Sequence, residues 1–304
     1  MSPGFDRPLY ILPFDHRPSL AEMFRWREPM NIAELTVIEV AKQIAYEGFK
    51  AAIAAGVPRD KGAIAIDELF GARIMRQAAE EGYMFACPAE KSGQSEFEFQ
   101  YGENFAAHIE EFRPTFCKVS VNYNPEGDGA ANRRQAERLK KLSDYLRENS
   151  STRFMFELMV SPEKAHLEKT HGDRSAYEKE VRPGLTVRAI HELQDAQVEP
   201  DVWNVEGFEC KEDFQKIVTA ARCGGRGKVG CVVIGRGQGE DTIRKWLTLA
   251  SEVPGFIGFA VGRTDFQQPL AIWRAKEGTR EAATETIARR YRELVDIFEK
   301  ARLK

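Results

Sequence analysis

The chain has few cysteines and neither a long apolar run nor a Gly/Ser-rich segment. No two of its five cysteines form a Cys-x-x-Cys pair, since they are Cys87, Cys117, Cys210, Cys223 and Cys231. The odd number and scattered spacing favour reduced thiols over a disulfide framework or a structural zinc site. No apolar stretch approaches the ~20 residues that a membrane-spanning helix needs. The first residues also lack the hydrophobic run of a signal peptide. We therefore expect a cytoplasmic protein without a membrane partner.

A surplus of charge of one sign is also missing. The chain has 44 Lys and Arg residues against 47 Asp and Glu residues, a formal net charge of -3. This balance gives no indication of nucleic-acid binding. The 304 residues, 42% of them hydrophobic, are enough for one large α/β barrel or for two ordinary domains. Because no Gly/Ser-rich linker divides the chain, we expect a single domain over residues 1–304.

Short apolar segments typical of strands alternate with segments of helical apolar spacing. The predicted strands cover residues 9–14, 63–66, 83–87, 116–121, 154–158, 200–207, 229–234 and 256–261. Helical segments lie at about 31–56, 70–81, 130–148 and 184–196, and the end of the chain is helical over about 268–302. Alternating strands and helices predict a parallel sheet. Eight such units favour a closed (β/α)8 TIM barrel over an open doubly wound sheet.

Two connections, at about 88–112 and 160–182, are longer than usual. Long loops in compact domains are often lids over a site. For residues 160–182, which are densely charged, a solvated surface helix is the alternative. His166 and His171 in this segment lack the spacing of metal ligands, and His16 is the only histidine at a strand end. We therefore expect no metal and no other cofactor.

Polar residues at the ends of barrel strands are the candidates for catalysis. Lys118 lies in an otherwise apolar strand and shares one face with Ser120 and Asn122. Burial would make this lysine lose its proton more easily, and a neutral amine can form a Schiff base with a ketone. The alternative is a structural lysine that pairs with Glu157 or Glu206.

Two further strands place polar groups among apolar residues. Glu157 lies between Met155 and Met159 on one face of its strand. A carboxylate in such surroundings must be paired or have a raised pKa, and it could transfer protons during carbon–carbon bond cleavage. A buried ion pair with Lys118 is the alternative. Asn204 and Glu206 share a face of the sixth predicted strand, which indicates the inside of a barrel near its mouth.

The last two strands are followed by glycine and arginine. Gly235, Arg236 and Gly237 follow the seventh strand, and Gly262 and Arg263 follow the eighth. Phosphate sites in these barrels are often built from these two loops. The arginine side chain can donate several hydrogen bonds to an oxyanion. We therefore predict a phosphate site here.

Acidic residues follow the first three strands. Asp15, Asp67 and Glu68 could bind sugar hydroxyls or, less favourably, a divalent cation. Glu90 and Lys91, after the third strand, are further candidates for substrate binding.

Several of these motifs occur together in one known family. They are Leu12-Pro13-Phe14-Asp15-His16-Arg17, Lys118-Val119, Tyr123-Asn124-Pro125, Pro200-Asp201-Val202-Trp203 and Gly258-Phe259-Ala260-Val261-Gly262-Arg263-Thr264. Over nearly its whole length the chain resembles the 2-deoxy-5-keto-gluconate 6-phosphate aldolase-type domain of myo-inositol catabolism, in a stand-alone form. The segments Asp67-Glu68, Gly71 and Glu90-Lys91-Ser92-Gly93 are more distantly similar to tagatose 1,6-bisphosphate aldolases. The resemblance implies a (β/α)8 fold, a phosphorylated keto-sugar substrate and a class I mechanism through a lysine Schiff base.

The chain departs from the family at the Schiff-base position. The family has Trp-Lys-(apolar)-Glu on the sixth strand, whereas this chain has Trp203-Asn204-Val205-Glu206. An amide cannot form an imine, but it can hydrogen-bond a carbonyl or a hydroxyl. Three interpretations follow: a catalytically silent homologue that binds a sugar phosphate, a Lys-to-Asn variant of an active aldolase, or an amine supplied by Lys118 or Lys91. Asp15, Glu157 and Glu206 would complete the site, and the sequence leaves assembly as a homo-oligomer open.

Overall fold

Eight parallel strands close into a barrel in chain order. A computed structural model describes residues 3–26 and 29–302, without the side chains of Pro18, Ser19 and Thr264. Each strand pairs with the next one, and the first also pairs with the last. The strands are β1 (Leu9–Pro13), β2 (Gly62–Ala65), β3 (Met84–Pro88), β4 (Phe116–Asn122), β5 (Arg153–Met159), β6 (Val202–Glu206), β7 (Gly230–Ile234) and β8 (Phe256–Ala260). The predicted (β/α)8 barrel is confirmed.

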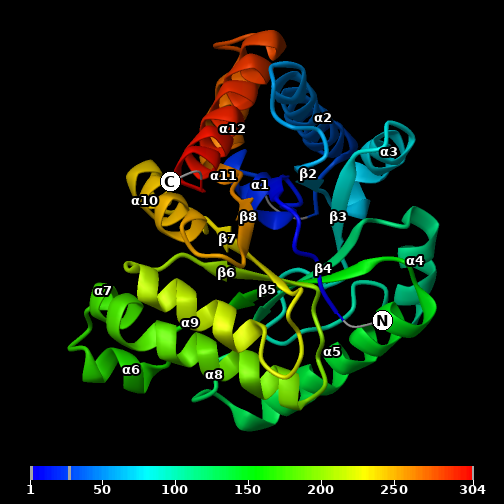
Figure 1. Cartoon of the computed structure of the whole chain (residues 1–304). Helices are drawn as coiled ribbons and strands as arrows, with labels where there is room; N and C mark the ends of the chain where they lie inside the picture. Colours follow the sequence, from blue (N-terminus) through cyan, green and yellow to red (C-terminus); the bar gives the residue numbers. More distant parts are fainter. Residues whose placement is uncertain (1–2, 27–28, 303–304) are drawn as a thin grey trace.

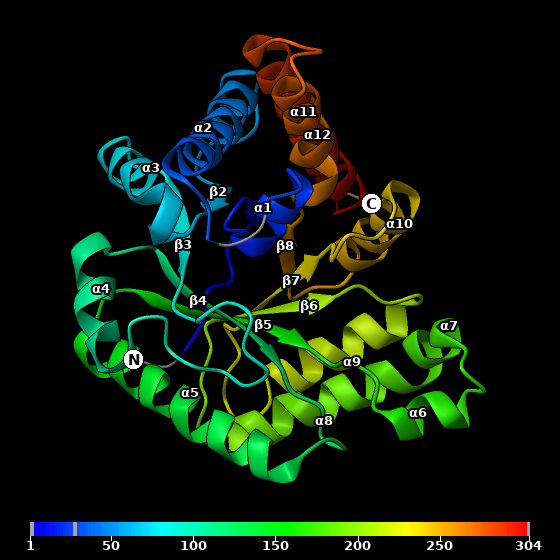
Figure 2. The same ribbon diagram turned by 180° about the vertical axis from the view of Figure 1, so that it is seen from behind.

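Helices surround the strands as an outer ring, and the short α1 lies inside this ring (Figures 1 and 2). They are α1 (Pro18–Met23), α2 (Ile32–Ala54), α3 (Glu68–Glu80), α4 (Phe105–Phe112), α5 (Gly129–Asn149), α6 (Lys164–Lys169), α7 (Arg174–Ala176), α8 (Arg182–Asp195), α9 (Lys211–Ala221), α10 (Glu240–Ser251), α11 (Arg263–Arg274) and α12 (Arg280–Arg302). A 3₁₀ turn, η1 (Gly102–Asn104), precedes α4, and a π-helical turn, η2 (Tyr177–Val181), precedes α8. In the part of the chain that the structure describes, no helix has the length and apolar character to cross a membrane.

The structure differs from the sequence-based expectation at the end of the chain. The helical region expected over 268–302 is two helices, because Lys276 has a left-handed φ of 60° and interrupts the run. The Thr279 hydroxyl accepts a hydrogen bond from the Ala282 N–H at 3.1 Å and thereby caps the start of α12. The connection at 160–182, for which a solvated surface helix was the alternative to a lid, contains the short helices α6 and α7 and the turn η2, with His166 and Tyr177 buried.

The barrel interior is apolar at its floor and polar at its mouth. Phe116 and Met155 lie in the inner core, whereas Phe154 and Phe156 pack outward against the helices. Because successive side chains alternate between the two faces of a strand, Lys118 points to the same side as Phe116, one pleat closer to the mouth. The same alternation brings Glu157 of β5 and Asn204 of β6 to the mouth of the barrel.

Candidate active site

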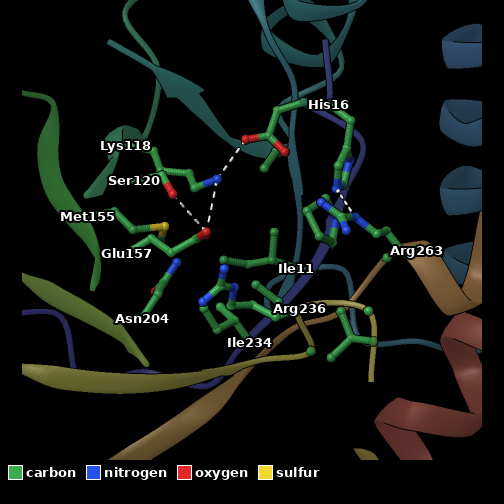
Figure 3. A pocket seen from close by; sticks show the side chains of 18 of the residues that line it. Ile11, His16, Lys118, Ser120, Met155, Glu157, Asn204, Ile234, Arg236 and Arg263 are labelled. Atoms are coloured by element: carbon green, nitrogen blue, oxygen red, sulfur yellow. Dashed lines mark hydrogen bonds and ion pairs between the residues drawn. The ribbon is translucent and has the colours of Figure 1, made fainter. Parts of the chain in front are cut away.

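A cavity of about 200 Å³ opens at the C-terminal ends of the strands. Side chains from β1, β2 and β4–β8 line it, together with residues of the loops after β1, β7 and β8. Figure 3 shows the labelled side chains directed into this space. Its charged or strongly polar lining residues are Asp15, His16, Lys118, Ser120, Glu157, Asn204, Arg236 and Arg263. The strand alternation therefore gathers residues that are far apart in the sequence.

Lys118 stands between two carboxylates on one wall of the cavity. Its Nζ donates to Oδ2 of Asp15 at 2.7 Å and lies 3.1 Å from Oε2 of Glu157. The Ser120 hydroxyl donates to Oε1 of Glu157 at 3.0 Å. All three charged side chains are at most 18% exposed. This wall is therefore a compact ion cluster, drawn with dashed lines in Figure 3.

The charge state of Lys118 is the opposite of the sequence-based expectation. Burial alone would lower its pKa, but the carboxylates of Asp15, Glu157 and Glu90 raise it above the ordinary value. Although burial disfavours a charged carboxylate, Lys118 holds the pKa of Asp15 below its usual range. The prediction of an easily deprotonated lysine was wrong, and the alternative of an ion pair with Glu157 is confirmed. Lys118 is therefore an ammonium group in this cavity.

Asn204 lies beside this cluster on β6, in register with Glu157. The residue is 1% exposed, and neither its Nδ2 nor its Oδ1 has a hydrogen-bond partner in the described part of the chain. An unpaired buried polar group costs roughly 1–3 kcal/mol. Its neighbours Trp203 and Val205 point outward into the core between barrel and helices. The amide therefore faces the cavity with both of its polar ends unpaired.

The part of the cavity wall that follows β7 and β8, here called the arginine wall, carries two arginines. Arg236 lies in a tight turn after β7, where Arg236 and Gly237 have φ values of 43° and 77° and the Gln238 N–H donates to the Gly235 carbonyl at 2.9 Å. The Arg236 Nη1 donates to Oε1 of Glu206 at 3.2 Å. This contact holds Glu206, which was predicted as a site residue but does not line the cavity, against Arg236.

Arg263 is the first residue of α11, so its backbone and side chain both lie at a helix N-terminus. Its Nε donates to the His16 Nε2 at 3.2 Å. Burial, reinforced by the charge of Arg263, lowers the pKa of His16 to about 4, so the ring is a neutral acceptor at pH 7. At Gly262, a Cβ would lie 2.2 Å from the Pro13 carbonyl oxygen. Only glycine therefore lets the loop after β8 approach β1 this closely.

Three predicted substrate-binding residues do not line the cavity. Asp67 is buried in an ion pair with Lys42 and also caps α3, where its Oδ1 accepts from the Phe70 N–H at 3.0 Å. Lys91 is exposed outside the cavity. Glu90 is held by Arg17, whose Nη2 lies 3.1 Å from its Oε1, and burial raises its pKa to about 7. The charge of Glu90 contributes to the raised pKa of Lys118.

Two basic residues that were not predicted as site residues shape the site from outside the cavity. Lys42, in the middle of α2, donates to the backbone carbonyls of Phe14 and His16 at 2.7 and 2.9 Å and thereby fixes the loop after β1. Arg17 connects that loop to Gln100 in the long connection after β3, at 3.1 Å. Both depend on partners distant in the sequence. Lys42 resembles any basic residue on a helix, whereas Arg17 belongs to the motif that ends the first strand.

A group with metal-ligand spacing lies outside the cavity, on α3 and α4. The ligand atoms of Glu68, His108 and Glu111 all lie within 4.8 Å of one another, in the part of the chain described. The His108 Nδ1 is 2.8 Å from Glu68, and Glu111 pairs with Arg76 at 2.8 Å. These contacts already satisfy the three side chains, so a cation would have to displace them.

A family model described as "Uncharacterized protein conserved in bacteria (DUF2090)" matches residues 5–302. Among solved structures, the chain resembles the Corynebacterium glutamicum protein Cgl0159 at 16% identity and a TM-score of 0.54, over 95% of this chain and 87% of that one. It also resembles a fructose-bisphosphate aldolase from Slackia heliotrinireducens at 14% identity and a TM-score of 0.54, over 96% and 86% of the two chains. At these identities the likeness establishes a shared fold. No curated protein matches the sequence.

Proposed function

The chain belongs to the DUF2090 family of bacterial proteins, and on that premise we propose that it acts on a phosphorylated keto sugar by aldolase-type chemistry. The observation that carries this proposal is that the ion cluster of Lys118 and the guanidinium groups of Arg236 and Arg263 line one and the same cavity. The fold that it shares with a fructose-bisphosphate aldolase supports the same assignment by analogy.

The arginine wall suits the phosphate. Arg236 and Arg263 each offer several N–H donors, and the N-terminus of α11 adds a positive dipole end at the same place. The neutral His16 ring leaves the positive charge of Arg263 uncompensated on that side. A dianionic phosphate would therefore meet donors and positive charge at this wall, where Glu206 already accepts from one N–H group of Arg236.

The ion cluster suits the carbonyl end of the substrate. Because Lys118 is an ammonium group and Asn204 cannot form an imine, a carbonyl would be activated by charge and hydrogen bonding. Glu157 would accept the proton of the hydroxyl that is β to the carbonyl, and the carbon–carbon bond electrons would move into an enolate beside Lys118. The products are an aldehyde and an enolate, and the enolate carbon takes up the proton that Glu157 received.

An assay with borohydride tests this mechanism. The first substrate is 2-deoxy-5-keto-gluconate 6-phosphate, which the sequence resemblance implies. We expect release of an aldehyde, no covalent adduct by intact mass after borohydride, and loss of turnover in Lys118→Met. An adduct that disappears in Lys118→Ala would overturn the imine-free route and make Lys118 the nucleophile.

A catalytically silent sugar-phosphate-binding homologue is the second candidate. The asparagine at 204, where the resembling family has its Schiff-base lysine, favours it. Under this alternative the wild-type chain binds the sugar phosphate without turning it over, and Asn204→Lys does not produce strong retro-aldol activity. Turnover in the wild-type chain would exclude this candidate, whereas strong activity only after Asn204→Lys would identify a Lys-to-Asn variant of an active aldolase.

A further inference from the structure

Asn204 has both of its side-chain polar atoms unpaired, whereas His16, the other cavity residue with a buried unpaired atom among those described, lacks a partner at Nδ1 alone. Lys118, Asp15 and Glu157 pair with one another, and the two arginines have partners in Glu206 and His16. Asn204 is 1% exposed, with both Nδ2 and Oδ1 unpaired. Because buried polar atoms in folded proteins almost always have a partner, this pair of atoms points to a ligand or to ordered water.

The two unpaired atoms require a particular ligand. Nδ2 can only donate and Oδ1 can only accept, so a complementary group must present one acceptor and one donor side by side. A phosphate or carboxylate offers acceptors alone, and an ammonium offers donors alone. A carbonyl next to a hydroxyl offers both, at neighbouring carbon atoms. The requirement is the same in either orientation of the amide.

The residues around Asn204 favour a hydroxy ketone over a dicarbonyl as its ligand. Glu157 is the partner of Asn204 on the adjacent strand, and its carboxylate oxygens accept hydrogen bonds. A second carbonyl next to the first would face this carboxylate without a proton to donate, whereas a hydroxyl would be accepted. Met155 and Ile234 supply apolar surface beside the amide. A dicarbonyl is therefore a poor fit, and a hydroxy ketone is a good one.

We infer that Asn204 is a specificity-determining residue, which selects phosphorylated ligands with a keto group directly next to a hydroxyl-bearing carbon. This inference rests on the proposed function, because it assumes that the phosphate lies at the arginine wall. A site that hydrogen-bonds a ligand group rejects an analogue that lacks the group, because its own buried atoms then stay unpaired. We expect at least ~10-fold discrimination against an analogue that lacks either the carbonyl or the hydroxyl.

Four small probes test the inference by calorimetry. Dihydroxyacetone phosphate has both groups, acetol phosphate has the carbonyl without the free hydroxyl, glycerol 3-phosphate has hydroxyls without a carbonyl, and inorganic phosphate has neither. We expect dihydroxyacetone phosphate to bind at least ~10-fold more tightly than each of the other three. In Asn204→Leu, close in size but without polar atoms, and in Asn204→Asp, which keeps acceptors alone, this preference should shrink to a few-fold.

The controls separate the inference from the proposed function. Asn149→Leu, at an exposed position at the end of α5, should keep the full preference. Thermal unfolding of each variant establishes that it is folded. Equal binding of the three organic phosphates by the wild-type chain, all tighter than inorganic phosphate, would overturn the inference and leave the proposed function standing. Binding of none of them more tightly than inorganic phosphate would overturn both.

Discussion

The orientation of a side chain at the cavity follows from its place in the strand, whereas its protonation state depends on partners that are distant in the sequence. The alternation along β4, β5 and β6 predicted that Lys118, Glu157 and Asn204 face inward, and the structure places all three in the cavity. The pKa of Lys118 could not be predicted, because its partner Asp15 lies 103 residues earlier. Lys118 stays protonated because the closed barrel brings Asp15 next to it, and no local sequence pattern shows that contact.

Removing the unpaired amide should stabilise the unliganded protein. Asn204→Leu replaces two buried polar atoms without partners by an apolar group of similar size, so the penalty for desolvating them disappears. We expect the free energy of unfolding to rise by about 1 kcal/mol, measured by urea denaturation without ligand. A decrease of similar size would mean that the amide is satisfied in solution, for example by ordered water.

Glu90 should make stability depend on pH. Burial raises its pKa from an ordinary value of 4.5 to about 7, so between these values the folded protein holds a proton that the unfolded chain has released. Its contribution is therefore fully present below about pH 4.5 and is lost as the pH rises through about 7. Relative to the wild type, Glu90→Gln should gain about 2 kcal/mol in free energy of unfolding between pH 5 and pH 8. Urea denaturation at both pH values gives this difference, and a flat difference would contradict the expected pKa.

Strands and long helices followed their sequence patterns, whereas short helices did not. All eight strands were predicted within about two residues of their observed ends, since apolar runs between turn residues are a strong signal. The six-residue α1 and the eight-residue α4 were not predicted. Helices this short are marginal in isolation and form because they pack against the rest of the protein.

The junction between β8 and α11 should control anion binding. A Cβ at Gly262 would lie 2.2 Å from the Pro13 carbonyl oxygen, a backbone atom that cannot give way easily. Gly262→Ala should therefore shift the start of α11 with Arg263 and weaken phosphate binding by ~10-fold or more, measured by calorimetry. Gly239→Ala is the matched control, because a Cβ there meets no atom within 4 Å. Equal losses in the two variants would argue against a role for this close approach.

For the molecule as a whole, ring closure is what assembles the site. β1 pairs with β8, so the loop that carries Asp15 lies next to the loop that carries Arg263. The sequence predicted this ring and most residues at its mouth. Asp67, Glu90, Lys91 and Glu206 were predicted there but do not line the cavity, because a side chain at the end of a strand can also turn toward the surrounding helices and loops. The partners that hold Asp67 and Glu90, Lys42 and Arg17, are distant from them in the sequence, so no local pattern predicts these two pairs.

One buried ion pair connects the helix ring to the barrel. Lys42 on α2 pairs with Asp67 after β2, and both side chains are at most 1% exposed. Lys42→Met leaves a buried carboxylate without its cation, so we expect a loss of about 3–5 kcal/mol in the free energy of unfolding. Lys50→Met, which breaks a pair with Glu81 that is about 30% exposed, should cost less than about 1 kcal/mol. Chemical denaturation of both variants checks this contrast, which similar losses would refute.

The asparagine on β6 has a consequence for heredity. Asparagine and lysine codons differ only in their third base, so a single nucleotide change converts one into the other. Glu157 is the partner of that residue in the strand register, and Lys118 lines the same cavity. One point mutation in the gene would therefore place a lysine amine in the barrel cavity at position 204. Such a change can arise spontaneously in a growing culture.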